Sequence, residues 1–364
     1  MSAIRPLERD DLPAVAALYA DFMGWDADAT RPGLVAYYAR TMLDHPSFDT
    51  EIPTLVFEDP RDGVVGVLGS NVRRFAYRDR PVRLACDGPL IVHPAHRSRG
   101  VGALLLRKYL DGPQDVTADD RAIDQVHEML VRLGGETHGV ASLGWSLVLA
   151  PVRFVAGAFA RRTTGREQPP VPRLLARADT LADRRLRAAP RAGAVEPLAN
   201  DALCELIERL GRRFPLRPQY DGAHLGWLFG EMAAANVDGQ LVRRLVRADD
   251  GRPAGSYVLY VERHGLAEVI QVVTSEADAP LVLDHLVHDA AAGGAVEVRG
   301  RFEHHLLAAL RRRRCRTVPV DWACVHARDP ELLAAVHGGR ALVTRLDGEW
   351  WMRPDPFAPA AAAA

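Results

Sequence analysis

An internal repeat constrains the fold of this chain more than any other feature of the sequence. The segment from Ile4 to Leu12 recurs as Val195 to Leu203, with an apolar residue, Pro-Leu, Asp and Leu at identical spacing. Each copy predicts a short strand followed by an amphipathic helix, and the Asp is suited to cap that helix. The match continues downstream as a second helix and then a strand, an Asp/Gly-rich turn and a strand. These matched segments are 32–43 with 223–232, and 54–67 with 244–257.

The repeat and the length together predict two domains. The chain has 364 residues, of which 48% are hydrophobic, and this length favours two packed cores over one. We expect an α/β (α+β) protein in which each domain has a mixed, largely antiparallel central sheet flanked by helices. The expected parts are an N-terminal domain over 1–159, a linker over 160–193, a C-terminal domain over 194–357 and a disordered tail over 358–364.

Composition and charge argue against several classes of function. Lys and Arg number 46 against 47 Asp and Glu, so no bulk field attracts a polyanion, and neither nucleic acid nor a membrane is an expected partner. The four cysteines form no C-x-x-C pair, and we expect no metal site. The charged N-terminus lacks the apolar core of a secretory signal. These features predict a cytoplasmic protein, and the abundance of Ala and Arg indicates a bacterial one.

The segment that carries chemistry runs from Val92 to Ala103, between a predicted strand and a predicted helix. Gly100 and Gly102 leave no side chain between the backbone and a ligand. The first N–H groups of a helix have no intrahelical acceptor, and the helix dipole favours an anion beside them. The pattern matches neither a Walker loop nor a dinucleotide-binding glycine fingerprint. A diphosphate is the anion that we expect here.

Over residues 1 to about 150 the sequence resembles the GNAT acyltransferase superfamily. The family pattern V-x-P-x-x-R-x-x-G-x-G/A is present as Val92, Pro94, Arg97, Gly100 and Gly102, followed by Ala103. With the repeat, the resemblance implies two tandem GNAT-like domains and a co-substrate that is acetyl-CoA or another acyl-CoA. It implies that the strand residues Ile91 and Val92 offer backbone groups to pantetheine. It also implies that the diphosphate is cradled by Arg97, Ser98, Arg99, Gly100, Val101, Gly102 and Ala103.

One position departs from the family pattern. Many members carry a Tyr in the helix that follows the next strand, where it protonates the leaving thiolate. Aligning the sequence on Leu133-Gly134 places Leu130 at that position. Three alternatives therefore stay open: another group donates the proton, the thiolate leaves unassisted, or this domain binds coenzyme A without turnover.

Attack on a thioester needs a neutral amine, so a base must take a proton from the ammonium. We select Asp87 as the catalytic base because it lies on the strand just before the glycine loop. The competing interpretation is a bulge or turn carboxylate beside Gly88-Pro89. Cys86 is expected to be a buried small residue rather than a nucleophile. Other candidates for proton transfer are His93, His96, Tyr77 and Tyr109.

The second copy lacks the glycine loop. At the equivalent place, after a strand over 268–273, the sequence from Thr274 to Pro280 contains no glycine. Glu276 and Asp278 stand where a diphosphate would lie, so we expect an ordinary helix start and no coenzyme A site.

The end of the second copy predicts a strand, a helix and a hairpin. The strand is expected over 295–299 and the helix over 304–314. The hairpin is expected over 341–352 with Asp347-Gly348 as its turn. Successive residues of a strand point to opposite faces, so Trp350 and Trp351 are expected on different sides.

The preferred functional hypothesis is an acyl-CoA-dependent N-acyltransferase, most simply an acetyltransferase, acting on a primary amine of a small metabolite. The first copy would catalyse the transfer, and the second would be structural and help to shape the substrate cleft. A non-catalytic acyl-CoA-binding protein that senses the cofactor or docks a partner is the alternative, and acylation of a protein amine is a third option. The sequence leaves open the acceptor, the acyl chain length and whether the chain forms a homodimer.

Overall fold

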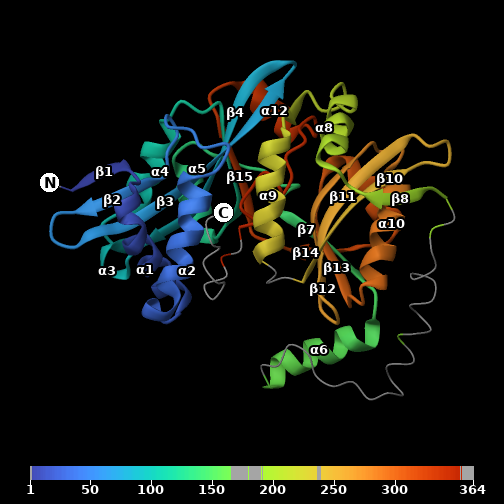
Figure 1. The fold of residues 1–364 in the computed structure, drawn as a ribbon, viewed down its shortest axis with the longest axis horizontal. Coiled ribbons are helices and arrows are strands. Elements are labelled where there is room, and N and C mark those ends of the chain that lie inside the picture. The colour runs from blue at the N-terminus through green and yellow to red at the C-terminus, as the bar shows by residue number, and fades with distance from the viewer. Residues whose placement is uncertain are drawn as a thin grey trace. The chain divides into compact units, whose positions relative to one another are not determined.

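A computed structural model describes residues 2–164, 179, 190, 192–235, 239–352 and 354. The chain divides into two compact units, each built around its own mixed sheet (Figure 1). Unit 1 comprises Met1–His138, Pro215–Val237 and Asp321–Ala364, and unit 2 comprises Gly139–Phe214 and Asp238–Val320.

The sheet of unit 1 has the strand order β1-β2-β3-β4-β5-β15-β6, and a further strand, β9, pairs with β3. The strands are β1 Ala3–Pro6, β2 Leu55–Asp59, β3 Gly63–Tyr77, β4 Arg80–Val92, β5 Val116–Ala122, β6 Glu136–Thr137, β9 Leu216–Pro218 and β15 Trp322–Ala327. The helices are α1 Leu12–Met23, α2 Ala27–Tyr38, a π-helical turn Ala39–Leu43, α3 Pro94–Arg97, α4 Val101–Leu110, α5 Asp124–Arg132, α9 Gly222–Ala235 and α12 Pro330–His337.

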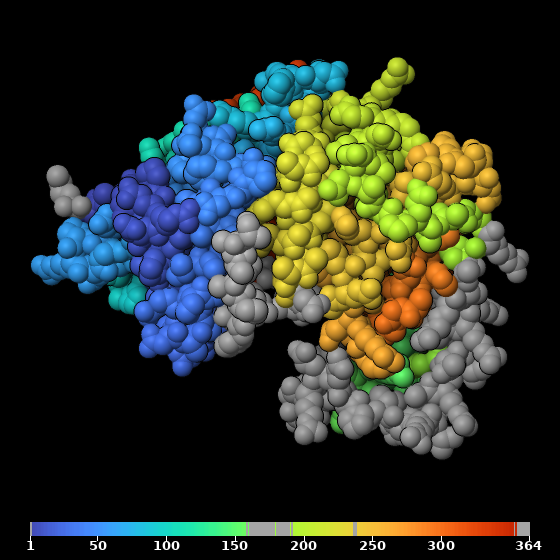
Figure 2. Space-filling model, viewed as in Figure 1, coloured from blue at the N-terminus to red at the C-terminus, as the bar shows by residue number. Residues whose placement is uncertain are grey.

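Helices cover both faces of this sheet. Apolar residues of α1 and α2 pack with Val56, Val67 and Ile91 in one core cluster. Residues of α4 pack with Leu68 and Ala85 in a second cluster on the other face. Figure 2 shows the yellow atoms of α9 directly against the blue N-terminal part of the same unit. The sequence over 64–77 and 82–92, joined by residues 78–81, predicts a long antiparallel hairpin, and β3 and β4 confirm it.

The sheet of unit 2 has the strand order β14-β7-β13-β12-β11-β10-β8. Its strands are β7 Leu143–Val148, β8 Ala194–Pro197, β10 Gln240–Arg247, β11 Pro253–Val261, β12 Leu266–Thr274, β13 Glu297–Arg301 and β14 Arg316–Pro319. Its helices are α6 Pro151–Thr164, α8 Asn200–Arg209, α10 Ala279–Ala292, a 3-10 turn His304–Leu306 and α11 Leu307–Arg312. From β8 onward the chain runs through β8, α8, β9, α9 and β10, and of these β9 and α9 belong to unit 1.

Each sheet contains a strand from the other half of the sequence. Strand β7 lies between β13 and β14, and β15 lies between β5 and β6. In Figure 1 the green β7 accordingly lies among orange strands of unit 2. The compact units therefore differ from the predicted domain ranges 1–159 and 194–357. Both exchanged strands pair antiparallel with a neighbour on each side, so neither leaves an open edge.

The predicted hairpin over 341–352 is wrong. Residues 345–351 form consecutive turns instead of two strands. Asp347 accepts hydrogen bonds from the backbone N–H and hydroxyl of Thr344, which closes a local turn before a hairpin can form. Trp350 and Trp351 are both buried, so they do not divide between a buried and an exposed face. The predicted tail 358–364, and the linker 160–193 apart from a few positions, lie outside the described residues.

The exchange of β7 makes a prediction for stability. A Cβ on Gly300 of β13 would lie 2.7 Å from ring atoms of the buried Trp145 of β7. We expect Gly300→Ala to lower the free energy of unfolding by about 1–3 kcal/mol through overpacking. Gly230→Ala in α9, where the added Cβ meets nothing within 4 Å, should be neutral or gain about 0.4–1 kcal/mol. Urea unfolding of both variants tests this, and equal effects would contradict the placement of β7.

Candidate functional site

Strand β4 separates from β5 halfway along its length. The two strands pair in parallel only where Leu84 to Cys86 meet Val116 to Ala118. Beyond Cys86, β4 continues to Val92 and pairs only with β3. Beyond Ala118, β5 continues to Ala122 and pairs only with β15. The second half of β4 therefore pairs with no described strand on the side away from β3.

The sequence Gly88-Pro89 accounts for this separation. Two residues of β4, Gly88 and Pro89, stand opposite the single residue Gly69 of β3, which is a β-bulge. A Cβ on Gly69 would lie 2.1 Å from the carbonyl oxygen of Gly88, so this close approach requires glycine. Bulges bend a strand, and proline has no N–H for a ladder. Asp87 immediately precedes the bulge, as the competing interpretation of that residue proposed.

The glycine loop follows directly from the end of β4. Gly100 adopts φ +73°, a left-handed conformation that favours glycine, and it is the N-cap of α4. Helix α4 then begins at Val101, so the amides of Val101, Gly102 and Ala103 have no intrahelical acceptor. A Cβ on Gly102 would meet its nearest neighbours at 3.7 Å, so the protein itself leaves room there. The predicted strand, loop and helix are all present.

The charged side chains of the loop divide into two groups. Arg97 Nε donates to the carbonyl of Val92 at 3.0 Å, which ties the loop to the unpaired part of β4. Arg99 instead forms an ion pair with Asp59, the last residue of β2, at 2.9 Å, and it also contacts the ring of His96. We therefore expect Arg99 to stabilise the loop rather than touch a ligand with its guanidinium.

The two loop histidines have structural partners. His96 is buried and lies 2.9 Å from Asp62. His93 caps α3 by accepting from the N–H of Ala95. Neither imidazole is brought to Asp87 by a described contact.

Asp87 is deeply buried, with 2% of its surface exposed, and its Oδ1 has no hydrogen-bond partner among the described residues. Burial raises the pKa of Asp87 to about 7, with a backbone hydrogen bond opposing the rise and the nearby charge of Asp120 adding to it. A carboxyl group with a pKa near neutrality is suited to exchange protons at physiological pH. The role of Asp87 as the catalytic base stays a prediction.

A second carboxyl group, Glu349, reaches the same place from the C-terminal segment. A Cβ on Gly88 would lie 2.2 Å from Glu349 Oε2, so the carboxylate of Glu349 lies against the backbone of β4. Asp120 holds this segment: its Oδ1 accepts from the N–H of Glu349 at 3.0 Å, and its carbonyl accepts from the Trp350 indole. Burial raises the pKa of Glu349 to about 8, with Arg121 opposing the rise and Asp120 and Asp87 adding to it.

Sequence reasoning missed Glu349. Its position 262 residues after Asp87 gave no local signal, and the expected hairpin turned attention to Asp347-Gly348. The usable signal was Gly348: a Cβ there would lie 2.2 Å from Asp120 Cγ, so only glycine lets the segment approach that carboxylate.

The remaining candidates are distributed as follows. Leu130 is in the apolar core with α4 and offers no proton. Tyr77 bonds to Glu331 near the far end of β3. Tyr109 lies close to Asp87, with its hydroxyl 2.9 Å from Ser70 Oγ, and burial followed by the charge of Asp87 raises its pKa well above the usual value. Cys86 is buried, and burial likewise raises the pKa of its thiol.

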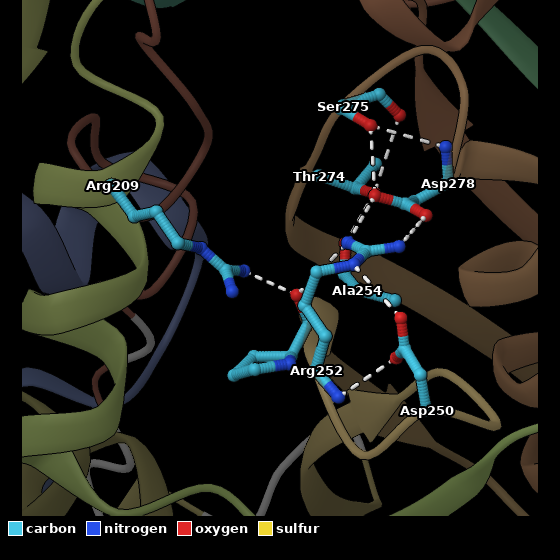
Figure 3. A network of polar contacts seen from close by, with 8 residues as sticks. Arg209, Asp250, Arg252, Ala254, Thr274, Ser275 and Asp278 are labelled. Carbon is cyan, nitrogen blue, oxygen red and sulfur yellow. Dashed lines mark hydrogen bonds and ion pairs between the residues drawn. The ribbon is translucent and has the colours of Figure 1, made fainter.

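The equivalent loop of unit 2 is closed by its own charges (Figure 3). Strand β12 ends at Thr274 and α10 begins at Ala279, as predicted. Asp278 accepts two hydrogen bonds from Arg252, both at 2.9 Å, and one from Ser275 at 3.0 Å. Its bonds to Arg252 lower the pKa of Asp278, so this carboxylate stays ionised before the helix. A carboxylate fixed there disfavours a second anion.

Three solved structures illustrate what this chain is similar to. A conserved Enterococcus faecalis protein of unknown function, a probable N-acyltransferase, matches with a TM-score of 0.57 and 7% identity, over 90% of this chain and 73% of that one. A GCN5-related N-acetyltransferase from Kribbella flavida matches with a TM-score of 0.55 and 16% identity, over 92% and 74%. The chain therefore has the GNAT fold. A Saccharomyces cerevisiae N-myristoyltransferase with bound myristoyl-CoA matches with a TM-score of 0.53 and 10% identity, over 89% and 82%.

At these identities the likeness concerns the fold: two mixed sheets flanked by helices. No family model and no curated protein matches the sequence. Among the described residues, no helix is long and apolar enough to cross a membrane, and no group of three or more His, Cys, Asp or Glu is arranged to hold a metal ion.

The burial of Asp87 makes a prediction for the pH dependence of stability. Its folded pKa of about 7 exceeds the ordinary value of 3.8, so between these two values the folded state keeps a proton that the unfolded state releases. Stability should therefore fall as pH rises through this window. Asp87→Asn should lose less stability than the wild type between about pH 4.5 and pH 8, by on the order of 2–4 kcal/mol. Urea unfolding at both pH values measures the difference, and equal losses would show that Asp87 is not a buried, unpaired acid.

Proposed function

We propose that unit 1 is an acyl-CoA-dependent N-acyltransferase, most simply an acetyltransferase, that acts on a primary amine of a small molecule. The observation that carries the proposal is the pair of carboxyl groups of Asp87 and Glu349, with pKa values of about 7 and 8, beside the bulge where β4 leaves β5. The glycine loop follows on the same strand. The proposal also takes the two units as a tandem pair of which only unit 1 is catalytic.

The cofactor is expected to lie along β4 and over the loop. Ile91 and Val92 lie in the part of β4 that β5 does not pair, so the amide groups of pantetheine can bond there as an added strand would. The N–H groups of Ser98 to Ala103 lie around the start of α4, where the dipole favours the diphosphate. This arrangement directs the thioester back along β4 to Asp87.

Starting from the ammonium, the reaction forms one C–N bond, breaks one C–S bond, passes one proton from nitrogen through the base to the solvent and moves a second proton from nitrogen to sulfur. The carboxyl pair is expected to take the proton from the acceptor ammonium, because its pKa values match neutral pH. The proton that nitrogen loses after attack then reaches the departing thiolate, either directly or through the carboxyl pair. No separate acid is needed in this scheme, which accommodates Leu130 in place of the family tyrosine.

The state of the four cysteines supports a proposal about the cellular compartment. All four cysteines are free, and Cys86 and Cys324 are buried. Free thiols fit a reducing compartment, so we place the reaction in the cytoplasm, and in a bacterial one on the evidence of composition.

The cofactor proposal is tested by Gly102→Glu. The substitution adds a carboxylate at the first turn of α4, where the diphosphate is proposed to lie. A Cβ on Gly102 makes only ordinary van der Waals contacts, at 3.7 Å or more, so we expect the variant to fold. We expect loss of acetyl-CoA binding by calorimetry with an unchanged unfolding midpoint. Leu104→Glu is the matched control, because Leu104 lies in the same helix and is 44% exposed. Undiminished binding by folded Gly102→Glu would remove the glycine loop from the site.

The base is tested by Asp87→Asn and Glu349→Gln. Each amide keeps the size of the side chain but accepts no proton at neutral pH, so at least one variant should lower the rate of thioester cleavage by about 10²–10⁴-fold. Acetyl-CoA affinity should stay unchanged, and the deficit should shrink as pH rises because more of the amine is already neutral. Glu331→Gln, at a carboxylate of α12 that bonds Tyr77, is the control and should react normally. Full rates in both test variants would exclude the carboxyl pair as the base.

The alternative function, acyl-CoA binding without catalysis, predicts a different outcome of the same assays. The wild type would then bind acetyl-CoA but release no free coenzyme A with any amine. The missing tyrosine at Leu130 is the observation that favours this alternative.

A further inference from the structure

Arg73 is a buried cation whose charge has no counterpart in contact with it. It lies in the middle of β3 and is 1% exposed. Its Nη1 donates to the carbonyl of Val72 at 3.2 Å, whereas Nε and Nη2 have no acceptor in the described part of the chain. A guanidinium stays protonated at physiological pH. Leaving two of its donors buried and unused costs stability, so the arrangement needs an explanation.

Arg40 of the same unit shows what this edge of a guanidinium binds when a partner is present. Its Nε and Nη2 donate to the two carboxylate oxygens of Glu231, at 2.9 and 3.2 Å. These two nitrogens form a planar fork whose spacing matches the oxygens of a carboxylate. In Arg73 the same two nitrogens lack an acceptor.

A series of aromatic rings, of both tryptophan and histidine, extends from Arg73. The Cζ of Arg73 lies 5.5 Å from the ring centre of Trp351, which contacts Trp227 edge-on at 5.3 Å. Trp227 in turn stacks on His45 at 5.4 Å and lies 6.0 Å from His224. The Nδ1 of His45 and the Nε2 of His224 are also buried without a partner in the described residues. Three residues of this cluster, Arg73, His45 and His224, thus carry buried polar atoms without a partner among the described residues.

The described neighbours of Arg73 do not supply an acceptor for its Nε and Nη2. Burial, helped by the charge of Arg73, lowers the pKa of His45 and of His224 to about 3, so both rings are neutral at pH 7. Asp347 is a buried carboxylate whose charge acts on Arg73. Its two oxygens, however, already accept hydrogen bonds from a tyrosine hydroxyl and from Thr344.

One connection joins this cluster to the proposed base. Trp351 follows Glu349 by two residues in the segment that Asp120 holds. Asn71 lies on the same face of β3 as Arg73 and pairs across the sheet with Cys86, so Asp87, the next residue of β4, points to the opposite face. The segment that carries Glu349 therefore continues to Arg73.

We propose that Arg73 binds a carboxylate of the acceptor, and that the acceptor is therefore an amine that also carries a carboxylate. A monoanionic carboxylate fills the fork and cancels its single charge. A phosphate dianion would instead bring two negative charges to the side of Arg73 where the charge of Asp347 already acts. This inference rests on the proposed function, because it takes the ligand of Arg73 to be the substrate of acyl transfer.

The test compares free acids with their amides. Release of coenzyme A from acetyl-CoA is measured with the full chain and the common α-amino acids, β-alanine and 4-aminobutyrate, each beside its carboxamide. At least one free acid should react with a kcat/KM about 10- to 100-fold above that of its carboxamide, since a charged hydrogen-bond pair is gained. Arg73→Gln should reduce this preference to near unity while retaining the rate with the carboxamide. Equal rates for every pair in the wild type would overturn the inference and leave acyl transfer standing.

Two controls keep the result interpretable. Arg40→Gln removes a fork that Glu231 already fills, so it should keep the preference for the free acid. Arg73→Lys retains the charge without the fork, and it replaces Arg73→Gln if that variant does not fold; its preference should fall below about one third of the wild-type value.

If no amine reacts, the proposed function is contradicted, and a binding measurement then tests the carboxylate site separately. Thermal unfolding is then followed with each free acid and carboxamide at millimolar concentration. Stabilisation by a free acid in the wild type and in Arg40→Gln, but not in Arg73→Gln, supports the carboxylate site; no difference between acids and amides overturns it.

Discussion

The separation of β4 from β5 after Cys86 is the constraint on which the rest of unit 1 depends. A parallel pair that continued to Val92 would fill the edge of β4 with β5 and would cover its backbone groups. The bulge at Gly88-Pro89 prevents this, and the close approach of Gly69 fixes it in place. The open edge then leads directly into the glycine loop. One local irregularity thus creates both the place for an extended ligand and its connection to a helix start.

The same region contains buried acidic groups that lower the stability of the folded protein, and a sheet with a purely structural role would lack them. Asp87 is a buried acid with one oxygen that has no partner among the described residues, and Glu349 is a second acid held against the neighbouring Gly88. Both pKa values rise because burial disfavours the charged forms. Asp120 contributes to each rise and also binds the backbone of the C-terminal segment, so the interaction that positions Glu349 also tunes it. Natural sheets tolerate such groups mainly at functional sites.

The sequence predicted local features well and long-range ones poorly. The hairpin of β3 and β4 and the loop from Val92 to Ala103 depend on neighbouring residues, so alternation and glycine spacing were enough. The exchange of β7 and β15 was hidden, because a strand pattern does not reveal which sheet the strand joins. Glu349 was hidden for the same reason: only the folded chain brings it to Gly88. Arg73 lies in a strand whose burial is predictable, but the absence of an acceptor is a property of the whole unit.

The account holds that the chain has one acyl-CoA site, formed by the open edge of β4 and the loop of unit 1, while Asp278 and Arg252 close the corresponding loop of unit 2. Titration calorimetry of the full chain with acetyl-CoA tests this claim most directly, because the stoichiometry does not depend on knowing the acceptor. The account predicts one molecule of acetyl-CoA bound per chain. Two equivalent sites would contradict the closure of the second loop, and no binding would contradict the assignment of the first.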